Sequence, residues 1–285
     1  MKYREIYELG SLKLKAAGIE EYNLDARLLL EHVLNTTATT LFSDPDMMVD
    51  EAGEKTYLAL IDERAKHVPL QHITKKQWFM GLEFNVSKDV LIPRQDTECL
   101  VELVQGELHD GMKILDMCTG SGCILLSLLK YSNDCVGVGA DISDKALKIA
   151  HKNAVDLGME EKLSDESLRF IQGNLFENVN ETFDIIVSNP PYIVTCEIES
   201  LMPEVKDHEP FIALNGKEDG LYFYNEIVKV ADKYLNKGGF IAFEIGNTQG
   251  REVSKLLKDA GFIDVKVTKD LCGNDRVVSA RRSVL

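Results

Sequence analysis

The alternation of strand-like and helix-like segments after residue 112 constrains the fold more than any other feature of this sequence. Four runs with helical spacing lie at 123–131, 144–158, 221–235 and 251–261. Seven short apolar runs typical of buried strands lie around them, at 112–117, 136–141, 168–172, 183–188, 239–244, 263–268 and 276–280. Strands that alternate with helices predict a mostly parallel sheet covered on both faces. Only residues 269–275 join the last two strands, so we expect the final strand to run antiparallel.

The first 75 residues show apolar positions at helical spacing and no strand alternation. Residues 23–34 predict an amphipathic helix with Asp25 placed to cap it, and residues 51–67 predict another helix. Residues 79–92 alternate and contain a turn-like stretch, Ser87-Lys88-Asp89, which predicts a hairpin. We therefore expect an all-helical domain at 1–75, a hairpin linker at 76–93 and an α/β domain at 94–285.

Composition argues against several classes of protein. The chain has 32 Lys and Arg against 47 Asp and Glu, a net charge of −15, which disfavours binding to a nucleic-acid backbone. No apolar run approaches the roughly 20 residues that a membrane span needs, and the first residues lack the apolar core of a signal peptide. The six cysteines form no CxxC pair and have no histidines clustered near them, so we expect no metal and reduced thiols in the cytoplasm.

A glycine-rich turn follows the first predicted strand, in ILDMCTGSGCILL at 114–126. Ligands of open α/β sheets bind at the carboxyl ends of the strands, so this turn predicts a cofactor site. Leu125 stands where a dinucleotide fingerprint has its third glycine, and the sequence has no phosphate-binding GKS or GKT. The alternative is a tight turn without a ligand. The predicted cofactor-binding residues of the turn are Cys118, Thr119, Gly120, Ser121 and Gly122.

The next two strands end in residues that suit an adenosine. Asp141 lies 19 residues after Gly122 and can accept both ribose hydroxyls, although it can also cap the following helix. After the third strand, Asn174 can contact adenine while Leu175 and Phe176 form walls, unless the stretch is an ordinary turn. An adenosine site without a phosphate cradle indicates S-adenosylmethionine, with S-adenosylhomocysteine as product.

Asp116, at the end of the first strand, has two possible roles in such a site. Its carboxylate can face the methionine amino group of the cofactor, or it can accept hydrogen bonds from the turn that follows it. The sequence leaves both open.

The stretch VSNPPYIV at 187–194 ends a predicted core strand with an amide, two prolines and an aromatic ring. Proline has no backbone N–H and holds the preceding residue extended, so the stretch offers rigid acceptors. The Asn189 side chain and the Pro190 carbonyl can hold both hydrogens of a planar NH2 group, with Pro191 beside them and Tyr192 flat against it. We predict Asn189, Pro190 and Tyr192 as catalytic, and Asn189 also beside the cofactor. The alternative is a proline-rich strand exit without a role.

Taken together, the sequence resembles the release factor glutamine methyltransferases, the PrmC/HemK family of class I methyltransferases. The resemblance covers nearly the whole chain, and its motifs are PLQHITKKQWFMGLEF (69–84), VLIPRQDTE (90–98), ILDMCTGSGC (114–123), NPPY (189–192), EPFIALNGKEDGL (209–221), FEIGNTQG (243–250) and DLCGNDRVV (270–278). It implies a Rossmann-like methyltransferase domain at 94–285 with a seven-stranded sheet, in which residues 118–122 form the cofactor loop, Asp141 holds the ribose and residues 189–192 receive glutamine.

The resemblance also implies a substrate and two further residues. The family methylates N5 of the glutamine in the Gly-Gly-Gln loop of peptide-chain release factors during translation termination, and the helical domain would dock that partner. Arg94 and Thr97 belong to a stretch that lies near the channel in the family. Departures from the family pattern at Gln95, Asp96 and residues 72–75 affect the detail of that channel.

Three alternatives stay open at this point. A ribosomal protein can replace the release factor as the glutamine substrate. NPPY also occurs in adenine-N6 methyltransferases of nucleic acid, although the acidic charge and the helical domain supply no basic flank for such a substrate. A non-catalytic cofactor-binding protein would be expected to lose NPPY or the glycine turn, and both are present.

Overall fold

A computed structural model describes residues 1–284 of the chain, which form two compact units. The smaller unit comprises Met1–Lys76 and the short segment Met202–His208. The larger unit comprises Gln77–Leu201 and the residues from Glu209 onward. The chain therefore leaves the larger unit after Leu201 and re-enters it at Glu209.

The smaller unit is helical, as the spacing of its apolar residues predicts. Its core is built from residues such as Ile6, Leu29, Leu30, Tyr57 and Ile61, which are fully buried. Its helices are α1 (Tyr3–Ala16), α2 (Tyr22–Leu34), α3 (Ala38–Ser43), α4 (Glu51–Arg64), α5 (Leu70–Thr74) and α10 (Pro203–Lys206).

The expectation that Asp25 caps a helix is wrong. Helix α2 begins one turn earlier, at Tyr22, so Asp25 lies inside its first turn. The Asp25 carboxylate is buried and accepts a hydrogen bond from Nε of Arg64 at 2.6 Å. A charged partner on α4, which the local sequence does not reveal, decides the role of this carboxylate.

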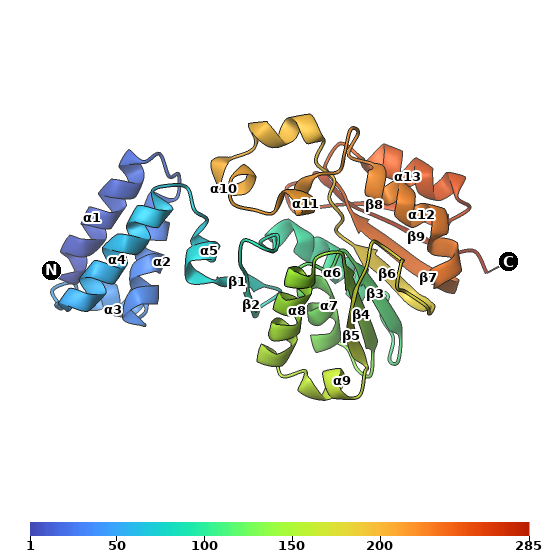
Figure 1. The fold of residues 1–285 in the computed structure, drawn as a ribbon, viewed down its shortest axis with the longest axis horizontal. Coiled ribbons are helices and arrows are strands. Elements are labelled where there is room, and N and C mark those ends of the chain that lie inside the picture. Colours follow the sequence, from blue (N-terminus) through green and yellow to red (C-terminus); the bar gives the residue numbers. More distant parts are fainter. Residues whose placement is uncertain (285) are drawn as a thin grey trace. The chain divides into compact units, whose positions relative to one another are not determined.

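The larger unit is built on a seven-stranded mixed sheet in the order β5-β4-β3-β6-β7-β9-β8 (Figure 1). Its first five strands pair in parallel, and β9 runs antiparallel to both β7 and β8, which confirms the expected antiparallel final strand. The strands are β3 (Lys113–Met117), β4 (Val136–Asp141), β5 (Leu168–Gln172), β6 (Phe183–Ser188), β7 (Leu235–Glu244), β8 (Ile263–Lys269) and β9 (Asp275–Arg281).

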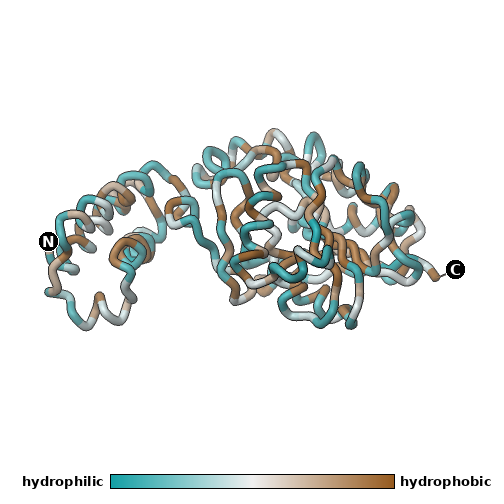
Figure 2. Tube along the Cα trace, turned by 60° about the horizontal axis from the view of Figure 1, so that its bottom comes forward, coloured by the Kyte–Doolittle hydropathy of each residue, from teal (hydrophilic) through white to brown (hydrophobic). Residues whose placement is uncertain are grey.

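Helices cover both faces of this sheet. Successive strand residues such as Ile114 and Leu115 point to opposite faces and therefore belong to two different hydrophobic cores. One core packs against α6 (Glu98–Gln105), α7 (Cys123–Lys130) and α8 (Asp144–Asp156), and the other against α12 (Tyr222–Tyr234) and α13 (Gly250–Asp259). The hydrophobic colouring of Figure 2 is densest along the strands between these helices. Short elements complete the unit: η1 (Gln95–Thr97), α9 (Glu160–Ser164), η2 (Thr195–Ser200) and α11 (Phe211–Leu214).

The expected hairpin exists, but its turn is not the predicted one. Strands β1 (Lys76–Phe79) and β2 (Leu82–Asn85) pair with each other and are joined by Met80 and Gly81. Both joining residues have positive φ, 51° and 70°, as a tight two-residue hairpin turn requires. The stretch Ser87-Lys88-Asp89 lies after β2 instead, where the Ser87 hydroxyl accepts from the Asp89 N–H at 3.1 Å.

Candidate active site

The strand register brings the sequence-predicted site residues into one row. Met117 pairs with Ala140 on β4 and with Ser188 on β6, and Ser188 pairs with Phe243 on β7. The residues that follow these strand ends are therefore neighbours across the sheet. The order of strands reverses between β3 and β6, which is where open α/β sheets bind ligands.

A cavity of about 310 Å³ opens at this edge of the larger unit. Its size lies within the range of small-molecule sites, roughly 300–1,000 Å³. Four of the predicted residues are not among those that line it: Gly122, Phe176, Pro190 and Tyr192. The predicted residues that do line it are Cys118, Thr119, Gly120, Ser121, Asp141, Asn174, Leu175, Asn189 and Pro191.

The glycine turn has the geometry that its sequence predicts. Cys118, Gly120 and Gly122 have φ values of 64°, 56° and 79°. A Cβ on Gly122 would lie 3.1 Å from side-chain atoms of Ala150 and Leu126, so this glycine lets α7 approach α8 beneath the turn. Gly122 therefore allows the close packing of the two helices next to the turn, whereas Gly120 lines the cavity.

Asp141 faces the cavity and ties β4 to the turn. Its Oδ2 accepts from the Gly120 N–H at 2.9 Å, and its Oδ1 accepts from the Ser143 N–H at 2.9 Å. The cap of α8 belongs to Ser143, whose hydroxyl accepts from the Ala146 N–H. Burial raises the pKa of Asp141, although backbone N–H groups oppose the rise. Each carboxylate oxygen keeps a second lone pair for a ligand hydroxyl.

Asp116 serves the turn and is not part of the cavity lining. It is fully buried, and its Oδ2 accepts from the Thr119 hydroxyl at 2.6 Å. Burial raises the pKa of Asp116 to about 7, against the opposing hydrogen bond from Thr119. The observed contact is that of an acceptor for the turn, one of the two roles that the sequence left open.

The loop after β5 contributes only part of the predicted adenine wall. Asn174 and Leu175 line the cavity, and Leu175 adopts a positive φ of 52°. Phe176 does not line it, which makes its predicted role as a wall wrong. Its ring is buried in the core and stacks on Tyr234 of α12 with centroids 4.3 Å apart.

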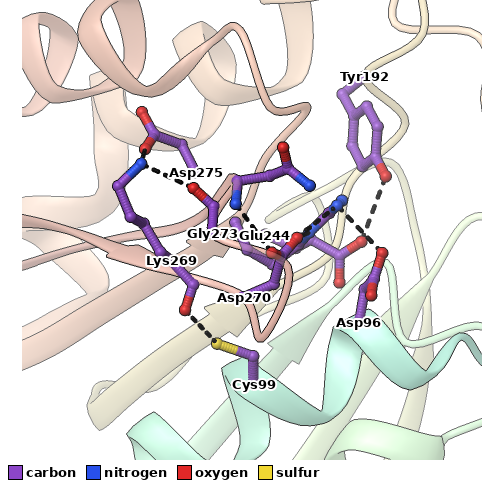
Figure 3. A network of polar contacts seen from close by, with 10 residues as sticks. Asp96, Cys99, Tyr192, Glu244, Lys269, Asp270, Gly273 and Asp275 are labelled. Carbon is purple, nitrogen blue, oxygen red and sulfur yellow. Dashed lines mark hydrogen bonds and ion pairs between the residues drawn. The ribbon is translucent and has the colours of Figure 1, made fainter.

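Asn189 lies half-buried at the cavity, with its Nδ2 3.4 Å from the Thr97 hydroxyl, to which it donates. Tyr192 is not among the lining residues, and its hydroxyl donates to Oε1 of Glu244 at 3.2 Å (Figure 3). The Tyr192 carbonyl accepts from Nε2 of Gln249 at 3.1 Å. The NPPY turn is therefore anchored at both of its ends.

Gly216 and Gly220, to which the sequence alone assigns no role, allow their backbone to pack closely against Tyr192 of the NPPY turn. A Cβ on Gly220 would lie 2.4 Å from the Tyr192 carbonyl oxygen, and one on Gly216 would lie 2.7 Å from the Tyr192 backbone. Only glycine fits such approaches. Both glycines stand in the stretch at 209–221 that carries the family resemblance, which was the signal available for them.

Glu244 and Arg94 are further functional candidates near the cavity. Glu244 ends β7, is buried, and has its pKa raised by burial, with hydrogen bonding from Thr97 and the charge of Arg276 opposing the rise. Arg94 lines the cavity and donates to Oε1 of the buried Glu209 at 2.7 Å. Burial raises the pKa of Glu209, and Arg94 opposes this rise.

Within residues 1–284, no group of His, Cys, Asp and Glu side chains is arranged to hold a metal ion. No helix in this part of the chain has the length and apolar character to span a membrane.

Comparison with known proteins covers both units. The family model described as PrmC N-terminal domain matches residues 5–74, and the model described as Methyltransferase small domain matches residues 94–203. The chain is 43% identical to the release factor glutamine methyltransferase of Clostridium acetobutylicum, with 100% of both chains covered. It is 42% identical to the Clostridium botulinum protein of that name, with 94% of this chain and 95% of the relative covered.

Solved structures are similar over the larger part of the chain. A methyltransferase from Pyrococcus furiosus aligns with a TM-score of 0.50 at 17% identity, over 71% of this chain and 90% of that one, which shows the fold alone. A release factor-specific protein-(glutamine-N5) methyltransferase from Alicyclobacillus acidocaldarius is 28% identical, with a TM-score of 0.41, over 70% of this chain and 99% of that one.

Proposed function

Because this chain belongs to the release factor glutamine methyltransferase family, we propose that it is a protein-(glutamine-N5) methyltransferase. It transfers a methyl group from S-adenosylmethionine to the side-chain nitrogen of the glutamine in the Gly-Gly-Gln loop of a peptide-chain release factor. The observation that carries this proposal is that Asn189 and Pro191 line the same cavity as the glycine turn and Asp141.

The residues of the cavity fit S-adenosylmethionine. The turn at 118–122 offers close backbone approach, Asp141 keeps lone pairs for ribose hydroxyls, and Asn174 and Leu175 border the adenine. When bound, the cofactor supplies an electrophilic methyl group on a positively charged sulfur. The half-buried carboxylate of Asp141 and the net charge of −15 suit a cationic ligand.

The NPPY turn aligns the substrate carboxamide for methyl transfer. The Oδ1 of Asn189 and the carbonyl of Pro190 accept the two hydrogens of the substrate carboxamide, which aims the nitrogen at the methyl group. Tyr192 holds the turn through its hydroxyl on Glu244, and its proposed role is to lie flat against the planar carboxamide. An amide nitrogen is a weak nucleophile, so a near-attack geometry contributes most of the acceleration.

Methylation of the amide nitrogen needs no strong base in the site. The turn at 118–122 and Asp141 would hold S-adenosylmethionine, which would supply the methyl group and be released as S-adenosylhomocysteine once the nitrogen–carbon bond has replaced the carbon–sulfur bond. The amide proton becomes acidic as the nitrogen is methylated and passes to water. The acceptors on Asn189 and Pro190 hold that proton until it leaves.

The smaller unit has a proposed role as the docking domain for the release factor, with residues 76–93 as linker and residues 94–285 as the methyltransferase domain. An acidic enzyme attracts basic patches on its partner, which favours encounter more than affinity. We place the enzyme in the cytoplasm, where its substrate acts, and assign it no metal and no direct nucleic-acid partner.

Labelled S-adenosylmethionine tests this function. The protein is incubated with a purified release factor, with ribosomal proteins and with DNA, and the labelled product is identified. We expect label on the release factor, and none on a release factor whose motif glutamine is replaced by alanine. Label on DNA alone would reject the proposal, and label on a ribosomal protein alone would replace the partner.

A further inference from the structure

Two of the four residues of the NPPY turn cannot donate a backbone hydrogen bond. Pro190 and Pro191 have no N–H, so neither residue can fix the backbone by donating to another segment. The carbonyl of Pro190 has a proposed role in holding the substrate, and it must stay free for that role. A neighbouring carbonyl that accepts from another segment can supply the missing anchor.

Gln249 donates to such a carbonyl, that of Tyr192. Its Nε2 lies 3.1 Å from the Tyr192 oxygen and 3.2 Å from the carbonyl oxygen of Gly220, and it donates to both. Its Oε1 accepts from the backbone N–H of Gly246 at 2.9 Å. Gln249 is only 9% exposed, so these hydrogen bonds are shielded from bulk water. One buried amide thus joins the NPPY turn, the loop between α11 and α12, and the loop between β7 and α13.

The polarity of its partners fixes the orientation of the Gln249 amide. Backbone carbonyls only accept, so Nε2 must face Tyr192 and Gly220. A backbone N–H only donates, so Oε1 must face Gly246. A reversed amide would place its oxygen against two carbonyl oxygens and its NH2 group against an N–H. A side chain that lacks two donors cannot make the same set of hydrogen bonds.

Close packing around Gln249 leaves the joined segments little room to move. A Cβ on Gly220 would lie 2.6 Å from Nε2 of Gln249 and 2.4 Å from the Tyr192 carbonyl oxygen. A Cβ on Gly246 would lie 3.1 Å from Oε1 of Gln249. The side chain of Tyr192 is held as well, since its hydroxyl donates to Glu244 at 3.2 Å (Figure 3). Both the carbonyl and the hydroxyl of Tyr192 therefore have fixed partners.

We propose that Gln249 is a positioning residue for the methyl transfer, and that it acts through the Tyr192 carbonyl on the direction of the Pro190 carbonyl. The inference rests on the proposed function, in which the Pro190 carbonyl and Asn189 hold the substrate carboxamide. The rings of the two prolines fix φ, so a displacement of Tyr192 is carried along the turn and not absorbed within it. Gln249 is not among the residues that line the cavity, and it belongs to the stretch at 243–250, to which the sequence alone assigns no role.

Gln249→Met removes both donors and keeps a side chain of similar length. We expect kcat on release factor, counted per S-adenosylmethionine-binding site, to fall about tenfold, because misplaced acceptors misalign the substrate nitrogen. A merely structural loss would lower the number of binding sites and not this kcat. The matched control is Asn236→Leu, which removes a half-buried amide that donates to Asp184 at 2.7 Å, at the other end of β7. Its kcat should stay within about twofold of the wild type, whereas a wild-type kcat in Gln249→Met would overturn the proposal.

Gln249→Glu tests the donors at nearly constant shape. An ionised carboxylate only accepts, so it would face the carbonyls of Tyr192 and Gly220 with no hydrogen to donate. The protonated form regains one donor, so the ratio of variant to wild-type kcat per binding site should rise as the pH is lowered. The titratable and charged groups around this position occur in both proteins and cancel in the ratio. They are Tyr192, Tyr224, Glu244, Asp275 and Arg276. A ratio that does not rise would contradict the proposal.

Crystal structures of the wild type and of Gln249→Met provide a readout that needs no substrate. We expect the carbonyl oxygens of Tyr192 and Pro190 to move by about 1 Å in the variant, while the turn at 118–122 keeps its place. An NPPY turn that keeps its position would overturn the inference even if the enzyme methylates release factor. Conversely, a wild-type protein that leaves release factor unlabelled would reject the proposed function, while the two crystal structures would still decide whether Gln249 places the turn.

Discussion

Buried carboxylates in the two units are stabilised in different ways. In the smaller unit, Arg64 donates to Asp25 at 2.6 Å and to Glu204 at 3.1 Å, and His67 lies 2.9 Å from the same Glu204 oxygen. Burial raises the pKa of Glu204, but the hydrogen bonds from His67 and Arg64 outweigh this effect and leave the pKa below its usual value. These carboxylates are neutralised by cations.

In the larger unit, the carboxylates around the cavity have mainly neutral donors. Asp116 accepts from a hydroxyl, Asp141 from two backbone N–H groups, and Glu244 from Tyr192. Burial raises the pKa of all three. Carboxylates whose pKa values are raised by burial beside a cleft identify a candidate functional site.

Breaking the ion pair of the smaller unit should have the largest effect. Arg64→Met leaves Asp25 and Glu204 without their shared cation, which costs about 3–5 kcal/mol for a buried pair. Hydrogen exchange of α2 and α4 measures the loss. Arg64→Lys keeps a charge but loses the forked geometry, so its loss should be smaller. Unchanged protection in Arg64→Met would show that this cluster does not stabilise the unit.

Removing the proposed substrate acceptor should be the next largest effect, and it falls on activity. Asn189→Ala should lower kcat on release factor at least about 100-fold, because alignment carries the catalysis. Its affinity for S-adenosylmethionine, measured by calorimetry, should change far less, and the stability of both units should be kept. Near-normal turnover would remove Asn189 from the mechanism.

A smaller effect on the free energy of unfolding is expected from Asp116→Asn, and its size depends on pH. The folded-state pKa of Asp116, about 7, lies above its unfolded value of 3.8, so the folded state binds more protons between these values. The free energy of unfolding of the wild type therefore falls as pH rises through this range. The asparagine variant lacks this loss and should be more stable than the wild type by on the order of 2 kcal/mol at pH 8.

Denaturant unfolding at pH 4.5 and pH 8 checks this prediction. The advantage of Asp116→Asn should shrink at the lower pH, where the wild-type carboxyl is protonated. An advantage that does not change with pH would mean that Asp116 is ionised without cost in the folded protein.

The sequence predicted what depends on local pattern. All seven strands of the sheet, the antiparallel final strand and the turn at 118–122 follow from apolar runs and glycines. The hairpin turn was missed because nothing in its sequence indicates that Met80 adopts a positive φ of 51°. Phe176 was misplaced because an aromatic residue after a strand fits a cavity wall and a core equally well.

The sequence could not predict contacts that depend on the order of strands. Tyr192 and Glu244 lie far apart along the chain, and the Tyr192 hydroxyl reaches the Glu244 carboxylate because β7 pairs with β6 in register, with Phe243 opposite Ser188. Asp25 was assigned to a cap for the same reason, since its partner Arg64 belongs to another helix. The sequence thus indicates where the chemical groups lie along the chain, whereas their hydrogen-bond and ion-pair partners can be identified only from the fold.

An exposed ion pair completes the comparison with the smallest expected effect. Lys255 lies 2.7 Å from Asp259 one turn along α13, and their side chains are 75% and 62% exposed. Water solvates both charges, so Lys255→Ala should change the free energy of unfolding by less than about 0.5 kcal/mol. Denaturant unfolding beside Arg64→Met measures the contrast directly. A loss comparable to that of Arg64→Met would show that burial is not what gives the ion pair of the smaller unit its strength.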